Sequence, residues 1–386
     1  MAQEPAPVAF TTTGHVDIAP GSVLGPRALN RALLARQLLL GRVEMPILSA
    51  IAHLVGLQAQ ASRPPYIGLW TRLAGFETSD LSRLIVERRV VRVSLMRVTI
   101  HLVTAAGGLA LRPLLQPLFA RALNSIAGRP DPDWDIQAIA VAGRALVETR
   151  PRTLLELGGL LAERWAGGDP IKLANVVRYS VPLVQVPPRG LWEGGGPATW
   201  TTLEAWLGRP LEPNPSLDEM AVRYLTAFGP ATVSDITAWS GLTRWRDVVD
   251  RLRPRLVTFR DKHGRELFDV PGAPLPHPET PVPPRLLAEF DNILLSHADR
   301  TRIIADADRK RVISVNGLVA GTALIDGFVG GTWKMERRGR AATLRIEPFT
   351  NLSAEVTAAL TAEGAQLLAF AASDAASHDI QFTPPR

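Results

Sequence analysis

Residues 217–271 read LDEMAVRYLTAFGPATVSDITAWSGLTRWRDVVDRLRPRLVTFRDKHGRELFDVP, and this stretch decides the fold class. Its first part has a helical period and stops at Gly229-Pro230, a pair that ends a helix. Two short helical stretches follow, separated by Gly241, and two β-rich runs then flank a turn at 262–264. A helix, a helix-turn-helix and a hairpin in this order predict a winged helix.

The same order recurs less clearly in two upstream segments. In residues 135–193, three helical stretches lead into VPLVQVPPRGLW, a candidate wing. In residues 27–104, PRALNRALLARQLLL, PILSAIAHLVGLQAQ and LSRLIVERR are helical, and VVRVSLMRVTIHLV alternates like a strand. Units of similar order predict tandem winged helices, because one such unit buries a small core and neighbours can share surface.

The C-terminal part has a different character. Its segments RLLAEFDNILLSHADR, RIIADADRKRVISV and TALIDGFVGGTWKM carry hairpin signals, and the proline-rich segment 271–284 is the best linker. We therefore predict an α+β protein of tandem winged-helix domains with a C-terminal β-rich portion. The predicted divisions are an N-terminal extension (1–26), three winged-helix units (27–107, 108–200 and 217–275) and a C-terminal region with a basic hairpin (285–386).

Length and composition exclude several classes of protein. The chain has 386 residues, 46% hydrophobic and 21% charged, which is ordinary for a soluble protein of several domains. No apolar run approaches the ~20 residues that span a bilayer. The N-terminus lacks the basic start and apolar run of a signal peptide, and the absence of cysteine excludes disulfides and thiolate chemistry. We expect a cytoplasmic protein with no membrane partner.

The basic residues are unusual in kind rather than in number. The net charge is only +6, but lysine occurs four times among the 43 basic residues, so 39 are arginine. The planar arginine fork pairs with phosphates and base edges, which suits nucleic-acid binding. Biased genomic composition would give the same usage, so this composition allows DNA binding without showing it.

Common catalytic motifs are missing from the sequence. It contains no G-x-x-x-x-G-K-[ST] phosphate loop, no G-x-S-x-G nucleophile elbow and no H-E-x-x-H helix. The seven histidines are scattered without ligand spacing, so we expect no metal and no cofactor. The run 296–299 (SHAD) has the residue types of a hydrolase triad, but adjacent residues of a strand point to opposite faces. A structural turn, or a phosphate contact through Arg300, is the preferred interpretation.

Five segments in a fixed order carry a family resemblance. They are HLVGLQAQASRPPYIGLWTRL around Gln58, then VSLMRVTIHLV, FGPATVSDITAWSGL, LLAEFDNILLSHADR and LIDGFVGGTWKM. Together they resemble the AlkZ/YcaQ-like family of winged-helix DNA glycosylases, over roughly residues 27 to 370. The resemblance implies a tandem winged-helix body with a concave DNA-binding face.

The resemblance also implies a catalytic motif of glutamine, an aliphatic residue and glutamine, which Gln58-Ala59-Gln60 fits. In the YcaQ-like branch aspartate replaces the second glutamine. Gln60 therefore favours the AlkZ-like branch, which includes enzymes that protect antibiotic-producing bacteria from their own DNA-alkylating products and act on interstrand crosslinks.

The spacing of the two glutamines makes a geometric demand. Residues two apart on an α-helix point about 200° away from each other, whereas in an extended chain they share a face. The preceding helix must therefore end near Gln58, and the prolines at 64 and 65 agree, because they disfavour helical backbone before them. From the residues alone, a polar pair making local hydrogen bonds at a helix end is the alternative.

Glutamine limits the chemistry that the motif can perform. An amide stays neutral and cannot act as a strong general base. A purine alkylated on its ring nitrogen is already cationic and leaves without protonation, so Gln58 and Gln60 would need only to hold and polarise a water. A bulky or crosslinked base would not have to enter a snug pocket, and an open site would suffice.

Candidate DNA-binding residues lie in three places. Arg97 and His101 share a face if their segment is a strand, and both could reach phosphate or sugar; a buried salt bridge and a satisfied histidine are the alternative. The basic tip of the hairpin expected at 302–315 could enter a groove, although a solvated turn is the ordinary explanation. The full set of candidates is Arg63, Arg97, His101, Arg300, Arg309, Lys310 and Arg311.

The leading hypothesis is a monomeric, monofunctional DNA glycosylase that acts on double-stranded DNA with alkylated purines or crosslinks. The alternative is a non-catalytic, regulatory DNA-binding protein of tandem winged helices. Its recognition helix would be LTRWRDVVDRL, which carries Arg244 and Arg246 but also two aspartates. A YcaQ-like general repair enzyme would differ only in substrate range.

Overall fold

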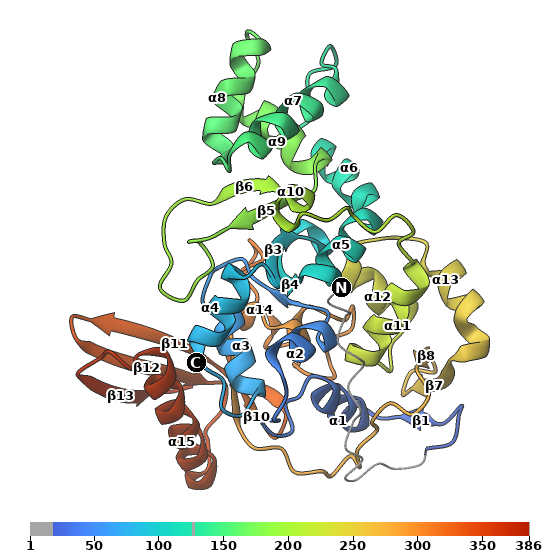
Figure 1. Ribbon diagram of the computed structural model, residues 1–386. Helices are drawn as coiled ribbons and strands as arrows, with labels where there is room; N and C mark the ends of the chain where they lie inside the picture. The colour runs from blue at the N-terminus through green and yellow to red at the C-terminus, as the bar shows by residue number, and fades with distance from the viewer. Residues whose placement is uncertain (1–17, 126–127, 386) are drawn as a thin grey trace.

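The computed structural model describes residues 18–125 and 128–385 of the chain. The described part is an α+β fold with three β-sheets, and its C-terminal part is rich in strands, as predicted (Figure 1). Most of the expected N-terminal extension, residues 1–17, lies outside the described residues. Within the described ranges, no helix combines the length and apolar character needed to cross a membrane.

The stretch that decided the fold class forms the expected elements. In chain order they are α11 (Leu217–Phe228), α12 (Val233–Ser240), α13 (Trp245–Leu252), the 3-10 helix η2 (Arg253–Arg255), β7 (Val257–Asp261) and β8 (Glu266–Asp269). Thr232 and Asp235 form a capping box at the start of α12, and Gly241, at φ 79°, ends it. The order of elements is therefore confirmed, and the winged helix stays our interpretation of it.

A strand that precedes α1 completes the sheet of this third unit. β1 (Val23–Leu24) pairs in parallel with β7, giving the order β1-β7-β8. Leu24 packs in a small apolar cluster with Phe259 and Leu267. Residues from the start of the chain therefore share a core with residues more than 200 positions later, which no local sequence pattern could indicate.

The first unit contains the expected helices and strands and one more helix. Its elements are α1 (Pro26–Arg36), α2 (Ile47–His53), β2 (Leu57–Gln58), α3 (Pro64–Arg72), α4 (Thr78–Val86), β3 (Val90–Ser94), the 3-10 helix η1 (Met96–Val98) and β4 (Ile100–Thr104). The addition is α3, which begins at two prolines. Proline suits the first helical turn, because the amide hydrogen that it lacks would have no helical partner there.

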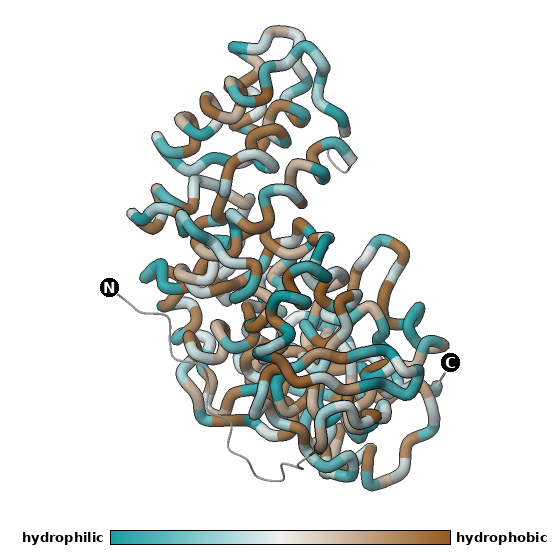
Figure 2. Tube along the Cα trace, turned by 90° about the vertical axis from the view of Figure 1, so that its right-hand side faces the viewer, coloured by the Kyte–Doolittle hydropathy of each residue, from teal (hydrophilic) through white to brown (hydrophobic). Residues whose placement is uncertain are grey.

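The second unit supplies helices and two strands. Its elements are α5 (Ala105–Leu114), α6 (Gln116–Ser125), α7 (Ile136–Thr149), α8 (Leu154–Arg164), α9 (Pro170–Ser180), β5 (Leu183–Val186), β6 (Thr199–Thr202) and α10 (Leu203–Leu207). Helices α7, α8 and α9 form a narrow extension at the top of Figures 1 and 2. β5 pairs with both β6 and β3, so the central sheet has the order β2-β4-β3-β5-β6. The strands of the first two units thus form one sheet.

The C-terminal region forms a third sheet with a long helix. Its elements are β9 (Arg285–Leu287), the 3-10 helix η3 (Asn292–Leu294), α14 (Arg309–Val312), β10 (Gly321–Ile325), β11 (Phe328–Arg338), β12 (Ala341–Pro348), α15 (Ala354–Ala371) and β13 (Ser377–Phe382). The strands have the order β13-β12-β11-β10-β9. Helix α15 was not predicted from the sequence; its buried face includes Leu360, Leu367 and Leu368.

Residues 302–315 do not form the predicted basic hairpin. The chain turns after Arg300, whose carbonyl accepts the amide hydrogens of Ile303 and Ile304, and then forms the one-turn helix α14. Both isoleucines are buried, whereas adjacent residues of a strand point to opposite faces. Packing of both side chains therefore favours a compact turn over a hairpin.

One hydrophobic core connects all the units. It extends from Leu33 of α1 through Leu183 of β5 and Phe228 of α11 to Leu368 of α15. Segment 271–284 forms no helix or extended strand pair and is held against α1, where Arg31 donates to the carbonyl of Thr280. The predicted units therefore share one core and do not each enclose a separate one. Their boundaries stay a prediction.

Candidate active site

Gln58 lies in a strand and not in a helix, as the spacing of the two glutamines requires, and the amide of Ala59 donates to the carbonyl of Ile100 in β4. Helix α2 ends at His53, and the chain turns into β2 through Gly56 at φ 87°. A Cβ on Gly56 would lie 2.4 Å from Cγ1 of Val103, so only glycine fits this turn. Ala59, between the two glutamines, is fully buried.

The turn between β3 and β4 orients both glutamine side chains. Nη2 of Arg97 donates to Oε1 of Gln58 over 2.8 Å, and the backbone amide of Ile100 donates to Oε1 of Gln60 over 3.1 Å. Gln58 is buried and Gln60 is exposed. Each oxygen keeps a second lone pair, and neither Nε2 atom has a hydrogen-bond partner among the described residues. Both amides can therefore still bind a water or a sugar oxygen.

Two adjacent residues, Asp291 and Asn292, support this segment from outside the first unit. Nδ2 of Asn292 donates to the carbonyl of Gly56 over 2.7 Å and so fixes the turn before Gln58. Asp291 forms a two-pronged ion pair with Arg72 of α3, with both N–O distances 2.8 Å. Both side chains are almost completely buried. Sequence reasoning assigned them no role, because nothing local marks a pair 219 positions apart.

Arg97 lies in a tight turn and not on a strand face. It belongs to η1, where it adopts a positive φ of 54° as the chain reverses between β3 and β4. The expectation that it shares a strand face with His101 is therefore wrong. Its Nη1 donates to the carbonyl of Trp239, so Arg97 connects Gln58 to helix α12 of the third unit. Burial, and then the nearby charge of Arg300, lower its pKa to about 10, which leaves it charged at neutral pH.

His101 cannot contact DNA in this structure. It lies on β4 opposite Gln58, is buried, and pairs its Nδ1 with the carbonyl of Thr99. Burial, then the charge of Arg97, lower its pKa to about 3, so the ring is neutral at physiological pH. His101 therefore fits the alternative interpretation, a buried histidine that forms its hydrogen bond inside the protein. The reason is that its strand, β4, lies inside the five-stranded sheet between β2 and β3, and both faces of that strand are covered.

The buried histidines His101 and His297 predict a loss of stability in mild acid. Burial lowers the pKa of each to about 3 from an ordinary 6.5. Below about pH 6 the unfolded chain therefore binds protons that the folded protein does not. The free energy of unfolding should fall by about 1.4 kcal/mol per pH unit for each histidine between about pH 6 and pH 4. Chemical denaturation at a series of pH values measures this slope.

The matching variants are His101→Gln and, as a control, His263→Gln at an exposed histidine. His101→Gln should reduce the dependence of the unfolding free energy on pH by about 1.4 kcal/mol per pH unit. His263→Gln should leave that dependence unchanged. An equal slope in His101→Gln and the wild-type protein would contradict the assignment.

Three predicted basic residues, Arg97, Arg300 and Arg309, lie near one another, and Arg97 contacts Gln58. Arg300 lies close enough to Arg97 to lower its pKa, and burial together with the charge of Arg309 lowers the pKa of Arg300 itself. None of the three forms an ion pair with a described residue. A row of arginines without carboxylates repels itself and is stabilised by an anion.

The remaining predicted basic residues differ in their exposure to solvent and in their contacts. Lys310 is exposed on α14. Arg311 is half-buried, stacks on Phe349 at 3.9 Å from the ring centre and pairs with Asp308, so it faces the protein. Arg63 is exposed just after the glutamines and lies 4.8 Å from the ring centre of Trp192.

Sequence reasoning missed a second basic element, the β11–β12 ribbon. Its tip carries Arg337, Arg338 and Arg340 around Gly339, which adopts a positive φ of 58°. Arg338 and Arg340 are exposed, and Arg337 pairs with Asp374. The signal is present in the sequence as ERRGRA, residues 336–341, between two alternating β-rich runs.

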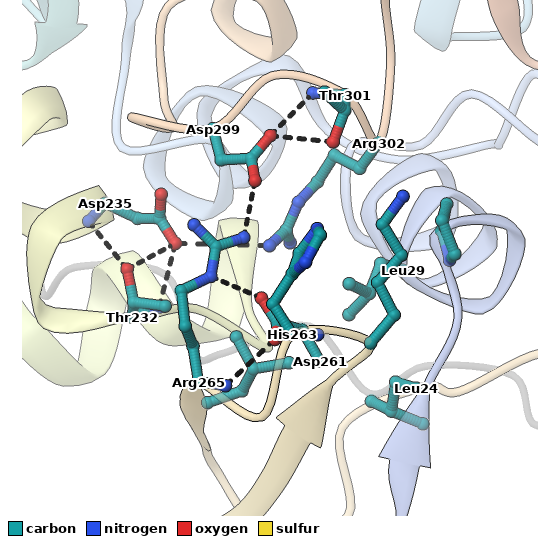
Figure 3. Close-up of a pocket in the computed structure, with 13 residues that line it drawn as sticks. Leu24, Leu29, Thr232, Asp235, Asp261, His263, Arg265, Asp299, Thr301 and Arg302 are labelled. Carbon is teal, nitrogen blue, oxygen red and sulfur yellow. Dashed lines mark hydrogen bonds and ion pairs between the residues drawn. The ribbon is translucent and has the colours of Figure 1, made fainter.

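A polar network joins the third unit to the loop after His297 (Figure 3). Arg265 of the β7–β8 hairpin bridges Asp261 and Asp299, and Arg302 faces Asp235 at 4.0 Å. The cavity beside them has about 20 Å³, room for about one water molecule. The network therefore stabilises the contact between two units and offers no substrate site.

Residues 296–299 do not form a hydrolase triad, as expected. Ser296 donates to the carbonyl of Asn292, and His297 pairs its Nε2 with the carbonyl of Phe228. Asp299 accepts from Thr301 and from an arginine. In the described part of the chain, no group of three or more histidine, aspartate or glutamate side chains could hold a metal ion.

Comparison with known proteins identifies the family and the fold of the chain. A family model described as DNA glycosylase AlkZ-like matches residues 51–370. The structure is similar to that of the Streptomyces sahachiroi DNA glycosylase AlkZ, with a TM-score of 0.72 and 21% sequence identity over 94% of this chain and 100% of that chain. At this identity the structural match shows a common fold. No curated protein sequence matches. Because the family model spans most of the sequence, the chain belongs to the AlkZ-like DNA glycosylase family.

Proposed function

We propose that the protein is a monofunctional DNA glycosylase that hydrolyses the N-glycosidic bond of N7-alkylated purines, including bulky adducts or interstrand crosslinks. The observation that carries the proposal is the pair Gln58 and Gln60, two amides whose carbonyl oxygens both accept hydrogen bonds from the segment 97–100. Arg97 and Ile100 already fix their carbonyl oxygens. Little reorganisation is then needed when a water binds between them, which is how a neutral group can contribute to catalysis.

In the proposed reaction the bond between C1′ of the sugar and N9 of the purine breaks first. The electron pair stays with the base, so a cationic N7-alkylguanine leaves as a neutral molecule and an oxocarbenium-like sugar remains. Water held by Gln58 and Gln60 adds to C1′ and loses a proton to solvent. Because glutamine cannot accept that proton, the enzyme depends on a good leaving group, and normal purines should be poor substrates.

The arginine cluster supports a DNA substrate. Arg97, Arg300 and Arg309 lie near one another without paired carboxylates among the described residues. A backbone phosphate would supply the missing anion and would also bring the sugar close to Gln58. We infer that Arg97 has two roles, orienting Gln58 directly and binding phosphate together with Arg300.

The double variant Arg309→Ala with Lys310→Ala should weaken DNA binding without unfolding the protein. Both side chains are exposed on the short helix α14 and contribute little to the core. Loss of two phosphate contacts should reduce the slope of log affinity against log salt by about 2. Fluorescence anisotropy at several salt concentrations measures this slope.

The matched control is Arg164→Ala with Lys172→Ala, the same change of charge on the extension formed by α7, α8 and α9. It should change the slope less. A fall in melting temperature with unchanged DNA binding would make Arg309 and Lys310 structural residues instead.

The proposed activity is tested by incubating the protein with duplex DNA that carries N7-alkylguanine. Release of free base, with formation of heat-labile abasic sites, is the expected result. A monofunctional enzyme should leave the strand intact until it is heated. Strand cleavage without heating would contradict the monofunctional assignment, and no release from any alkylated duplex would contradict the function.

The regulatory alternative loses support at helix α13. Trp245, which a recognition helix could have used against DNA, is buried and donates to Oγ of Ser240. The exposed residues that follow include Arg246, Asp247 and Asp250, and the two carboxylates repel phosphate.

A further inference from the structure

A large cavity opens directly after the glutamine motif. It has a volume of about 690 Å³, and its wall begins at Ala61 and Ser62, the two residues that follow Gln60. Consecutive Cα atoms are about 3.8 Å apart, so the cavity starts within one or two residues of the proposed catalytic amide. Pockets of this size accommodate drug-sized molecules, and a methyl group would occupy only a small part of it.

The cavity is assembled from segments that are distant in sequence. The start of α3 contributes Ile67, the loop between β5 and β6 contributes Trp192, and the segment after β9 contributes Glu289. Strand β11 adds Trp333 and Met335, two residues apart and therefore on one face of the strand. Two tryptophans, a methionine and an isoleucine form the apolar part of the wall, and charged side chains, among them Lys334 and Arg337, line the rest.

Both tryptophans are held in fixed positions. Nε1 of Trp333 donates to the carbonyl of Leu287 over 2.8 Å. Gly321 makes room for this ring, because a Cβ there would lie 2.7 Å from Cε2 of Trp333. Such fixation reduces the entropy lost when a ligand binds.

Trp192 is only half-buried, but it is equally well supported. Its ring packs against Tyr66 and Phe370, with ring centres 5.2 and 5.5 Å apart, and the guanidinium of Arg63 lies over it. A planar aromatic group is the ligand that such a wall favours, since it can stack on the guanidinium plane of Arg63 and pack against the edges of the tryptophans and the methionine sulfur.

We propose that this cavity, bounded by Trp192, Trp333 and Met335, binds the planar aromatic substituent of a bulky N7-alkylated purine while Gln58 and Gln60 act at its sugar. The proposal rests on the proposed glycosylase function. It adds a binding site that distinguishes lesions by the group attached to the base. Glu193 and Glu289, both exposed at the wall, can accept hydrogen bonds from hydroxyl or amino groups on the aromatic ring.

The test compares two duplexes alkylated at guanine N7, one with a methyl group and one with a naphthylmethyl group. Affinity is measured by competition binding, and base release is measured in single turnover with the enzyme in excess. The wild-type protein should bind the naphthylmethyl duplex more tightly. Met335→Trp, which fills the cavity, should reduce that preference about tenfold and leave binding and release of the methyl adduct within about twofold.

Trp192→Ala should also reduce the preference for the naphthylmethyl duplex. Trp192→Phe should retain much of that preference. The matched control is Trp206→Ala: Trp206 is also half-buried, lies under Arg88 at 4.1 Å, and is not part of the cavity wall. Melting temperatures establish that each variant is folded, and Met335→Trp tests the cavity even if Trp192→Ala does not fold.

Equal affinity of the wild-type protein for the two duplexes, or equal effects of the variants on both, would overturn the cavity proposal. Failure of the glycosylase function would look different, since neither adduct would be released. The binding preference and its loss in Met335→Trp would still decide the role of the cavity in that case.

Discussion

Gln58→Ala and Gln60→Ala should each lower the single-turnover rate of base release from N7-alkylated DNA by about 10²-fold or more. Each variant removes an amide that is already oriented, by Arg97 at Gln58 and by the amide of Ile100 at Gln60. The affinity for DNA should barely change, because neither glutamine is charged. Release of free base is measured with the enzyme in excess over a duplex containing N7-alkylguanine.

The double variant should lose less than the product of the two single effects, because residues that orient one water act as a unit. Gln366→Ala, at an exposed glutamine of α15, is the matched control and should release base at the wild-type rate. Wild-type rates in both active-site variants would make the motif structural and would redirect the search to another catalytic residue.

Gln60→Asp should retain appreciable activity. A carboxylate still accepts a hydrogen bond from water, and its negative charge lies near the developing positive charge of the sugar. Single-turnover base release, compared with Gln60→Ala, measures the difference. An aspartate variant as slow as the alanine variant would indicate that the amide nitrogen, not the oxygen, carries the function.

Asp291→Ala should lower the free energy of unfolding by about 3–5 kcal/mol, because it leaves the guanidinium of Arg72 buried without its partner. The pair lies between α3 and the segment that positions Asn292 against the turn before Gln58. Urea denaturation monitored by tryptophan fluorescence measures the change. At temperatures where the variant is folded, base release should also slow, because the support of Gly56 is disturbed.

The double variant Arg72→Met with Asp291→Leu should be less destabilised than the two single changes add up to, since no uncompensated charge remains. Full recovery is not expected, because Arg72 also donates to the carbonyls of Gln37 and Gly68. Arg83→Ala, at an exposed pair with Asp80 on α4, is the control and should change stability little. A small effect of Asp291→Ala would show that water reaches the pair.

Local sequence patterns predicted elements well and contacts poorly. The periodicity of 217–271 indicated three helices and a hairpin, and all are present because capping residues, glycine and β-branched runs act within a few positions. Helix α15 was missed, since its alanine-rich sequence has little amphipathic contrast to mark it. Segment 302–315 was predicted wrongly, because Ile303 and Ile304 pack into the core from a turn, a tertiary contact that its strand-like composition does not show.

In the candidate site, too, the sequence predicted the local backbone but not the contacts between distant residues. The extended backbone at Gln58 followed from its spacing with Gln60 and from the prolines after it, and the structure confirms that the preceding helix ends earlier. The proximity of Arg97 to Gln58 could not be deduced, because it depends on a turn with positive φ between two strands. His101 looked equally suitable for DNA in the sequence, and only its place inside the sheet shows that it is buried and neutral.

By itself, the sequence determined the fold class, the order of most elements and the position of the glutamine pair, because these depend on neighbours in the chain. Only the tertiary structure decided which distant residues support that pair. β5 joins the strands of two units in one sheet, Asp291 pairs with Arg72, and Trp192 and Trp333 meet at one cavity. Such contacts arise from packing into a common core, where the free energy depends on shape and burial and leaves no periodic signal in the sequence.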